Sequence, residues 1–374
     1  SGSGEWDEKD ENLGASLYLN NGTMHFIIDT SFAKINKHLI KALAFDYDKD
    51  EDTDIVLFPF IAPQDFPKGS EAVFLKNEKG IFSVDKKAAT NSTGNYMDAL
   101  TIDWNNDGWE DILTLGHWMS PEVWINNKGT FNKISLSDTL KGYWSALDVF
   151  DIDGDGTEEI FMGNVGNNWR YNLSSEDSLV VWDADFNKDG VKDPIVCTAE
   201  KGKYYPIYLY NDFTRNYPFT KKYILHQDDY SRADITQIFA DFDFKKAHYY
   251  TCNFQKSVML KKEKDGNYAP HILPEKIQEA PVNKFYAIDT PNTKSMLVLG
   301  QNKEMRDEIG TMDANRGQFF TYTTKNKWLY IPAYKTGINI QPETKDVLKI
   351  DDNTLLVITK EGTPIIIKYP STTK

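Results

Sequence analysis

Short stretches of strand-like polarity occur in pairs along the chain, and an acidic loop separates the two members of each pair. The clearest pair is in residues 146–164, ALDVFDIDGDGTEEIFMGN. Alternation with a period of two residues, or a short apolar run bounded by turn residues, predicts strands. An EF-hand would need flanking helices and a Glu at the twelfth loop position, which is Met162 here. The pattern therefore predicts a strand–loop–strand unit.

This unit occurs four times, in residues 42–58, 99–116, 146–164 and 179–197. In every copy, oxygen-bearing side chains lie at offsets 0, 2, 4 and 8 from the first carboxylate. The four sets are Asp46, Asp48, Asp50 and Asp54; Asp103, Asn105, Asp107 and Asp111; Asp151, Asp153, Asp155 and Glu159; and Asp185, Asn187, Asp189 and Asp193. Three copies have Gly at offset 5, where a sharp turn needs a positive φ. The first copy has Glu51 there, so its loop geometry is expected to be less regular.

Three weaker copies follow the first four. One keeps Asp241 and Asp243 but has Lys245 at the third ligand position, and those around residues 289 and 351 have lost the acidic set. Two further strand candidates follow most pairs, as in residues 71–85. Four short strands in each of seven units predict an all-β fold, a seven-bladed β-propeller with metal loops between the first and second strands of several blades.

The two ends of the chain are expected to complete one blade. Residues 15–29 have the form of a third and a fourth strand without a first pair, and residues 345–369 have a first pair and one more strand. Their union would close the ring and remove exposed sheet edges. We therefore predict one propeller domain over residues 13–374, preceded by a flexible acidic tail over residues 1–12. The initial SGSG is either an artificial leader or the start of a mature lipoprotein.

Alternating carboxylates on a tight loop repel one another unless a cation neutralises them. For one such loop an acidic surface turn is the better explanation, but four loops on one spacing favour a bound ion. Calcium accepts 6–8 oxygen ligands at flexible angles, whereas magnesium requires stricter octahedral geometry. A backbone carbonyl at offset 6, as at Trp109 or Thr157, could add a ligand. The sequence thus predicts up to four Ca²⁺ ions with a structural role.

Composition limits the possible partners. The 374 residues include 40% hydrophobic and 13% aromatic residues, enough for a packed core, and the formal net charge of −14 disfavours a nucleic-acid partner. No apolar run is long enough for a transmembrane segment. Cys197 and Cys252 lie in strand-like runs and could form a disulfide only if the two strands are neighbours, so their pairing stays open. The oligomeric state is open too.

The repeated Asp-x-Asp/Asn-x-Asp-Gly-x-x-Asp between strands resembles the FG-GAP/VCBS repeats of integrin-α-like seven-bladed propellers. More narrowly, the chain resembles the cartilage-acidic-protein-like VCBS proteins of Bacteroidetes, through GNVGNNWRYN, MDANRGQFF and the segment beginning TGINIQPETKDVLKI. The resemblance covers nearly the whole chain. It implies an extracytoplasmic binding or scaffold module, anchored at the cell surface or outer membrane as a lipoprotein. It also implies an accessory subunit of an outer-membrane complex of the SusC/SusD type.

The loops joining second to third strands should lie on the face opposite the metal loops. They are rich in Trp, Tyr, Asn and Arg, the composition of a surface that recognises a protein or glycan partner. The candidates are His117, Trp118, Asn164, Asn167, Asn168, Trp169, Arg170, Tyr204, Tyr205, Arg306, Asp313 and Arg316.

Catalysis has weaker support in the sequence. The six histidines are scattered, and the chain contains no Gly-x-Ser-x-Gly, P-loop or HExxH motif. A non-enzymatic protein–protein or protein–glycan interaction module is the favoured interpretation. The alternative is a polysaccharide lyase in which His117, with Tyr204 or Arg170, abstracts a proton beside a uronate.

Overall fold

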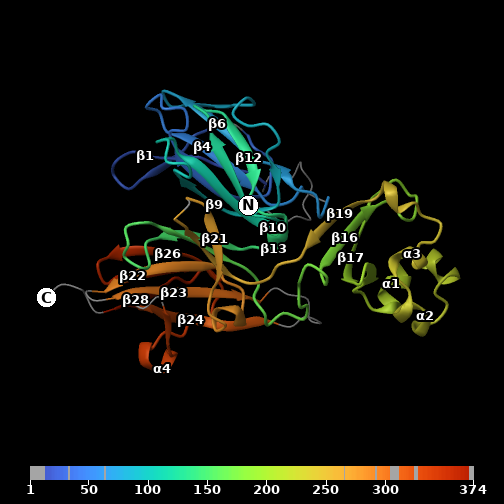
Figure 1. The fold of residues 1–374 in the computed structure, drawn as a ribbon. Helices are drawn as coiled ribbons and strands as arrows, with labels where there is room; N and C mark the ends of the chain where they lie inside the picture. Colours follow the sequence, from blue (N-terminus) through green and yellow to red (C-terminus); the bar gives the residue numbers. More distant parts are fainter. Residues whose placement is uncertain are drawn as a thin grey trace. The chain divides into compact units, whose positions relative to one another are not determined.

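The computed structural model describes residues 13–32, 34–62, 65–264, 266–290, 293–303, 311–323 and 327–369. These residues form mostly antiparallel β-sheets, which confirms the predicted mostly-β class (Figure 1). The chain divides into two compact units. The first comprises Ser1–Gly142 and Leu173–Phe254, and the second comprises Tyr143–Asn172 and Gln255–Lys374. The predicted tail over residues 1–12 lies outside the described residues.

The first unit contains a four-stranded sheet and a five-stranded sheet that share one core. The first sheet has the order β3 (Leu39–Phe45), β4 (Asp54–Pro59), β6 (Val73–Glu78) and β7 (Ile81–Val84). The second has the order β9 (Tyr96–Ile102), β10 (Asp111–Met119), β11 (Glu122–Asn126) and β12 (Phe131–Ser135). Alternate residues of both sheets meet in one aromatic cluster around Phe58, Phe74 and Trp124. The rings of Phe58 and Trp124 lie 5.9 Å apart.

Shorter elements complete this part of the chain. They are β1 (Tyr18–Asn20) paired with β2 (Phe26–Ile28), β5 (Ser70–Glu71) paired with β8 (Thr93–Gly94), and η1 (Asp138–Leu140). The two-residue β13 (Gly142–Tyr143) is the fifth strand of the second sheet, next to β10.

A third sheet of the first unit is covered on one face by helices. Its strand order is β18 (Lys203–Pro206), β17 (Asp193–Glu200), β16 (Leu179–Ala184) and β19 (His248–Cys252). The helical elements between β18 and β19 are α1 (Tyr210–Asn216), η2 (Pro218–Lys222), α2 (Gln227–Arg232), α3 (Ile235–Ile238) and η3 (Phe244–Lys246). Figure 1 shows α1, α2 and α3 on one side of this sheet, and their apolar side chains pack against Trp182 and Cys197.

The predicted fifth strand–loop–strand unit is wrong. Residues 235–246 form α3 and η3, and only β19 remains as a strand. The reason is a capping box, in which the Asp234 side chain accepts hydrogen bonds from backbone N–H groups and the Gln237 side chain accepts one from Asp234 N–H. Ile235 and Ile238 then bury one helix face.

The second unit contains three further sheets. One has the order β14 (Ala146–Phe150), β15 (Glu159–Gly163), β20 (Val258–Lys262) and β21 (Tyr268–Ile272). The next has the order β22 (Lys284–Thr290), β23 (Thr293–Asn302), β24 (Met312–Thr323) and β25 (Lys327–Ile331). The last has β26 (Thr344–Asp351), β27 (Thr354–Thr359) and β28 (Ile365–Lys368), and the short helices are η4 (Ile277–Glu279) and α4 (Ala333–Thr336).

Each of the four acidic loops joins the two strands of a hairpin, as predicted. The hairpins are β3–β4, β9–β10, β14–β15 and β16–β17. The strand order differs from the prediction in two places. β15 pairs with β20 rather than with a strand that follows it directly, and β19 pairs with the first strand of its unit, β16, rather than with the third, β18. The fourth repeat therefore lies in sequence between the second and third strands of the third. Closure of a seven-bladed ring by residues 15–29 and 345–369 stays a prediction.

The two cysteines are free and buried. Cys197 pairs with Val180 and Cys252 with Leu179, so the two strands flank β16 on opposite sides, and successive β16 side chains point to opposite faces. The thiols cannot meet across this sheet, which answers the question of their pairing. Burial raises the pKa of Cys252 to about 12. Among the described residues, no helix has the length and apolar character that crossing a bilayer requires.

Candidate metal centres

The four acidic loops share one backbone design. We call residues 46–54, 103–111, 151–159 and 185–193 loops 1 to 4. In each, the first carboxylate accepts hydrogen bonds from the loop's own N–H groups. Asp103, for example, accepts from Asp107 and Gly108, both at 3.0 Å. Asp46, Asp151 and Asp185 each accept two bonds in the same way, at 2.6–3.2 Å.

Loop 1 keeps this geometry despite its missing glycine. Gly108 has a φ of 82° and Gly156 a φ of 88°, as expected for the sharp turn. Glu51 takes the same conformation with a φ of 74°, which a residue with a Cβ adopts at some cost. The two hydrogen bonds to Asp46 hold the turn in place.

The carboxylates at offset 8 tie each loop to the second strand. Three of them, Asp54, Asp111 and Glu159, are almost completely buried. Each accepts a hydrogen bond from the N–H at offset 1 of its own loop, at 3.2, 3.0 and 3.0 Å, and Asp193 does the same at 3.0 Å. Asp54 and Asp111 also bond the third strand, through Asn77 N–H at 2.8 Å and Asn126 N–H at 2.7 Å.

Burial has the expected effect on these groups. Desolvation raises the pKa of Asp54 and of Glu159 to about 6, and it also raises the pKa of Asp111 and Asp193. Hydrogen bonds from the backbone oppose the shift in all four. The offset-8 position is thus a structural clamp as well as a candidate ligand.

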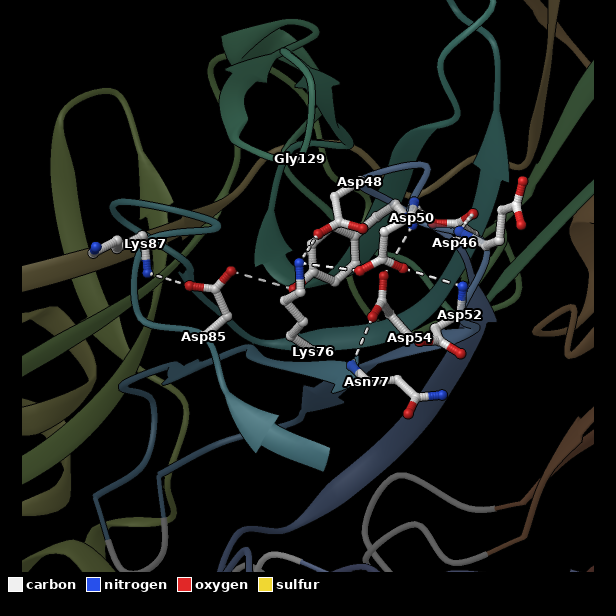
Figure 2. Close-up of polar contacts among 12 residues, drawn as sticks. Asp46, Asp48, Asp50, Asp52, Asp54, Lys76, Asn77, Asp85, Lys87 and Gly129 are labelled. Atoms are coloured by element: carbon white, nitrogen blue, oxygen red, sulfur yellow. Dashed lines mark hydrogen bonds and ion pairs between the residues drawn. The ribbon is translucent and has the colours of Figure 1, made fainter. Parts of the chain in front are cut away.

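A lysine enters loops 1 and 3 from the third strand of the sheet. Figure 2 shows Lys76 pointing between Asp48 and Asp50. Its ammonium forms an ion pair with Asp48 and lies 3.1 Å from the Asp50 carboxylate. These contacts, the one to Asp48 first, raise the pKa of Lys76, so it is charged at neutral pH.

Loop 3 has the same arrangement. Lys261 of β20 forms an ion pair with Asp153 and lies 3.6 Å from Glu159 and 3.8 Å from Asp155. The two lysines occupy equivalent positions, because each follows a leucine that pairs with the residue after the offset-8 carboxylate.

Loops 2 and 4 replace the aspartate at offset 2 by asparagine. Asn105 Nδ2 donates to the Asp107 carboxylate at 2.8 Å, and Asn187 Nδ2 donates to Asp189 at 2.9 Å. Within the described part of the chain, no ion pair involves the donor carboxylates of these two loops. Lys49 reaches loop 2, but it donates to the Gly108 carbonyl at 2.8 Å.

All four loops offer the hard oxygen donors that Ca²⁺ and Mg²⁺ prefer. Carboxylate oxygens of Asp46, Asp48 and Asp50 lie within 4.8 Å of one another, as do those of Asp151, Asp153 and Glu159. In these two loops, however, a lysine ammonium already binds the carboxylates. In loops 2 and 4 the side-chain oxygen of Asn105 or Asn187 accepts one hydrogen bond from a backbone N–H. Its second lone pair remains available to a cation.

The loop motif does not predict Lys76 and Lys261, because it contains oxygen donors alone and both lysines lie on other strands. A signal exists, since the third strands read VFLKN over 73–77 and VMLKK over 258–262, while the loop 2 counterpart reads EVWIN over 122–126. Residues 258–262 could not be assigned to loop 3, because the whole fourth repeat separates them in sequence.

The predicted recognition residues are scattered, and several are not accessible. Trp118 and Asn164 are buried, and His117 lies inside β10 with its ring against Phe60 at 5.1 Å. Tyr204 and Tyr205 lie in β18, and Asp313 and Arg316 form an ion pair of 2.5 Å within β24. Arg306 lies outside the described residues.

One group of candidates does gather in the second unit. Trp169 contacts the rings of Tyr143 and Tyr171 at 5.7 and 5.1 Å, and Arg170 lies over Tyr171. Asn167 donates to Glu275 at 2.8 Å, and its neighbour Asn168 is exposed. These contacts hold the segment together.

The environment of His117 weighs against its predicted catalytic role. Burial lowers its pKa to about 3, so the imidazole is neutral at physiological pH and a weak base. It therefore lacks the basicity that proton abstraction beside a uronate requires.

Comparisons with known proteins agree with the repeat and add little beyond it. The model of the FG-GAP-like repeat matches residues 103–162, which include loops 2 and 3. No curated protein matches. An Agrocybe aegerita lectin, described as recognising non-reducing terminal N-acetylglucosamine, is 17% identical with a TM-score of 0.30, over 72% of this chain and 76% of that one. BBS1N in complex with ARL6DN is 11% identical with a TM-score of 0.23, over 90% and 94%. TM-scores this low support no argument.

Proposed function

We propose that this protein is a non-enzymatic binding module that acts outside the cytoplasm and is stabilised by calcium. The observation that carries the proposal is the recurrence of one loop geometry in four hairpins, with carboxylates at equivalent positions in each. FG-GAP repeats are typical of extracellular domains, and the match over residues 103–162 supports this location. The low pKa of His117 disfavours the lyase alternative.

Calcium would bind first at loops 2 and 4. There Asp103, Asp107 and Asp111, or their loop 4 counterparts, would supply carboxylate oxygens together with an asparagine amide oxygen, and no ion pair among the described residues occupies these carboxylates. Ca²⁺ suits these irregular sets better than Mg²⁺, because it tolerates variable angles and mixed carboxylate and amide donors. The ion would join the first strand of the hairpin to the second, and binding to the folded state alone adds stability by mass action.

The wider role follows from the resemblance of the repeats. A seven-bladed propeller would present the long loops opposite the metal loops to a protein or glycan partner. Attachment as a surface lipoprotein to an outer-membrane complex of the SusC/SusD type is the assembly that we propose for it. The net charge of −14 is consistent with a partner other than nucleic acid.

A thermal melt in EDTA and in excess Ca²⁺ tests the proposal. We expect calcium to raise the melting temperature and Mg²⁺ at the same concentration to raise it less. As a control, the double variant Asp103→Ala, Asp185→Ala should lose most of the calcium effect. Indifference of the wild-type protein to chelator would contradict the calcium part, and pull-down from native membranes would test the partner.

A further inference from the structure

A pocket of ≈ 310 Å³ lies on the helix-covered face of the β16–β19 sheet, at the end away from loop 4. Loop 4 joins the end of β16 to the start of β17, whereas the pocket lies over the start of β16 and the end of β17. Val180 and Ala199 form its floor. The pocket thus lies on the sheet and is bordered by the β17–β18 turn, one of the loops that the sequence predicts to face a partner.

Two tyrosines stand on the two sides of this floor. Tyr204 pairs with Ala199 at one edge of the sheet, and Tyr249 pairs with Trp182 at the other. Directly paired residues share a face, so both rings rise beside the small floor residues. Each ring lies 5.3 Å from that of Trp182, which fixes its position, and Tyr249 keeps 61% of its surface exposed.

The rim of the pocket is polar and its charges balance. Ser175, Ser178 and Thr251 supply hydroxyl groups, and Glu176 and Lys201 supply one negative and one positive charge. The Trp182 side chain is only 9% exposed, and its indole N–H has no acceptor among the described residues. A ligand here would meet aromatic walls, several hydrogen-bonding groups and no net charge.

We propose that this pocket binds a single neutral sugar residue of a glycan chain. A pyranose has an apolar C–H face that stacks on tyrosine and a rim of hydroxyls that both donate and accept hydrogen bonds, and the pocket offers both complements. Its volume is at the lower end of the range for ligand pockets, which suits one ring rather than a long ligand. The balanced pair Glu176 and Lys201 favours a neutral sugar over a uronate. This inference rests on the proposed role as a binding module and specifies its ligand.

Saturation-transfer-difference NMR on the full chain tests it, with methyl glycosides of neutral hexoses, N-acetylhexosamines and uronic acids as probes. We expect saturation transfer to a neutral glycoside and none to a uronate. Tyr249→Ala should weaken binding about tenfold, which corresponds to about 1.4 kcal/mol for the lost aromatic contact. Tyr249→Phe, which keeps the ring, should stay within about threefold. Tyr334→Ala is the matched control, because that tyrosine is 83% exposed on α4.

Three outcomes would overturn the inference. They are absence of transfer to every neutral glycoside, preference for a uronate, and equal loss of binding in Tyr249→Ala and Tyr334→Ala. Each variant is first shown to melt like the wild-type protein, so misfolding is excluded. The calcium melt is independent of the pocket, so failure here and failure of the proposed module are distinguishable.

Discussion

Loops 1 and 3 differ from loops 2 and 4 in how they balance the same charge. Loop 1 has four donor carboxylates and one lysine, and so does loop 3. Loops 2 and 4 each have three donor carboxylates and a neutral asparagine. Four negative charges and one positive charge give −3, which is also the sum of three carboxylates. The extra aspartate at offset 2 is thus accompanied by an internal cation.

This difference shows that one motif can have two sources of positive charge. In the lysine loops, the ammonium of Lys76 or Lys261 is covalently part of the fold and is present at any calcium concentration. In loops 2 and 4, which have asparagine at offset 2, a cation that binds the donor carboxylates would have to come from solution. At the position of Lys76, loop 2 has Ile125, which cannot take this role. Calcium dependence should therefore differ between the two classes.

The largest effect should come from the clamp that both classes share. Asp111→Ala removes the acceptor for the part-buried N–H of Trp104 and the buried N–H of Asn126. We expect a loss of about 3 kcal/mol of unfolding free energy in urea titration, in EDTA as well as in calcium. Glu110→Ala, at an exposed neighbour, is the control and should cost little. A loss seen only in calcium would mean that Asp111 acts as a ligand alone.

The next effect separates the classes directly. Lys76→Met leaves Asp48 and Asp50 facing each other without a counter-charge, so we expect a loss of about 1–2 kcal/mol in EDTA. Calcium should restore most of it, since the emptied loop becomes a four-carboxylate site. Lys41→Met breaks an ion pair of 2.6 Å with Asp98 outside the loops and should not be restored. If calcium does not restore Lys76→Met, the lysine is not a substitute for the ion.

A smaller effect is expected from the reverse change in loop 2. Asn105→Asp adds a fourth carboxylate without a lysine, so repulsion should cost about 1 kcal/mol in EDTA. Calcium affinity, measured by calorimetry, should rise because another charged oxygen donor is present. Asn127→Asp, on an exposed turn, controls for added charge. Unchanged stability in both conditions would mean that the donor set tolerates any charge.

The smallest effect concerns acid, and it should be equal in calcium and EDTA. Burial lowers the pKa of His117 to about 3, whereas its ordinary pKa in the unfolded chain is about 6.5. Below pH 6.5 the unfolded chain therefore takes up a proton that the folded protein does not. The folding stability associated with the neutral His117 is thus fully present well above pH 6.5 and is lost as the pH falls towards 3. At pH 6 the loss should be about 0.8 kcal/mol. His117→Gln should remove it, and a calcium-dependent difference would mean that the histidine is coupled to the loops.

The sequence predicted those features that depend on local pattern. Period-two alternation and the offsets of the donors were enough to predict the hairpins that loops 1 to 4 connect. The acidic pattern of Asp241 and Asp243 predicts strands, whereas the capping box at Asp234 starts a helix there. Pairing of β15 with β20 could not be predicted, because register between distant strands leaves no local signal. Lys261 was missed for the same reason.

The number of calcium ions that the wild-type protein binds tests the two-class account most directly. Calorimetric titration of chelator-treated protein, with elemental analysis after dialysis, would count them. The account predicts a value near two, one ion each for loops 2 and 4. Asp103→Ala and Asp185→Ala should each remove one of them, and Asp46→Ala and Asp151→Ala should remove none. A value near four, or ions lost on changing Asp46 or Asp151, would contradict it.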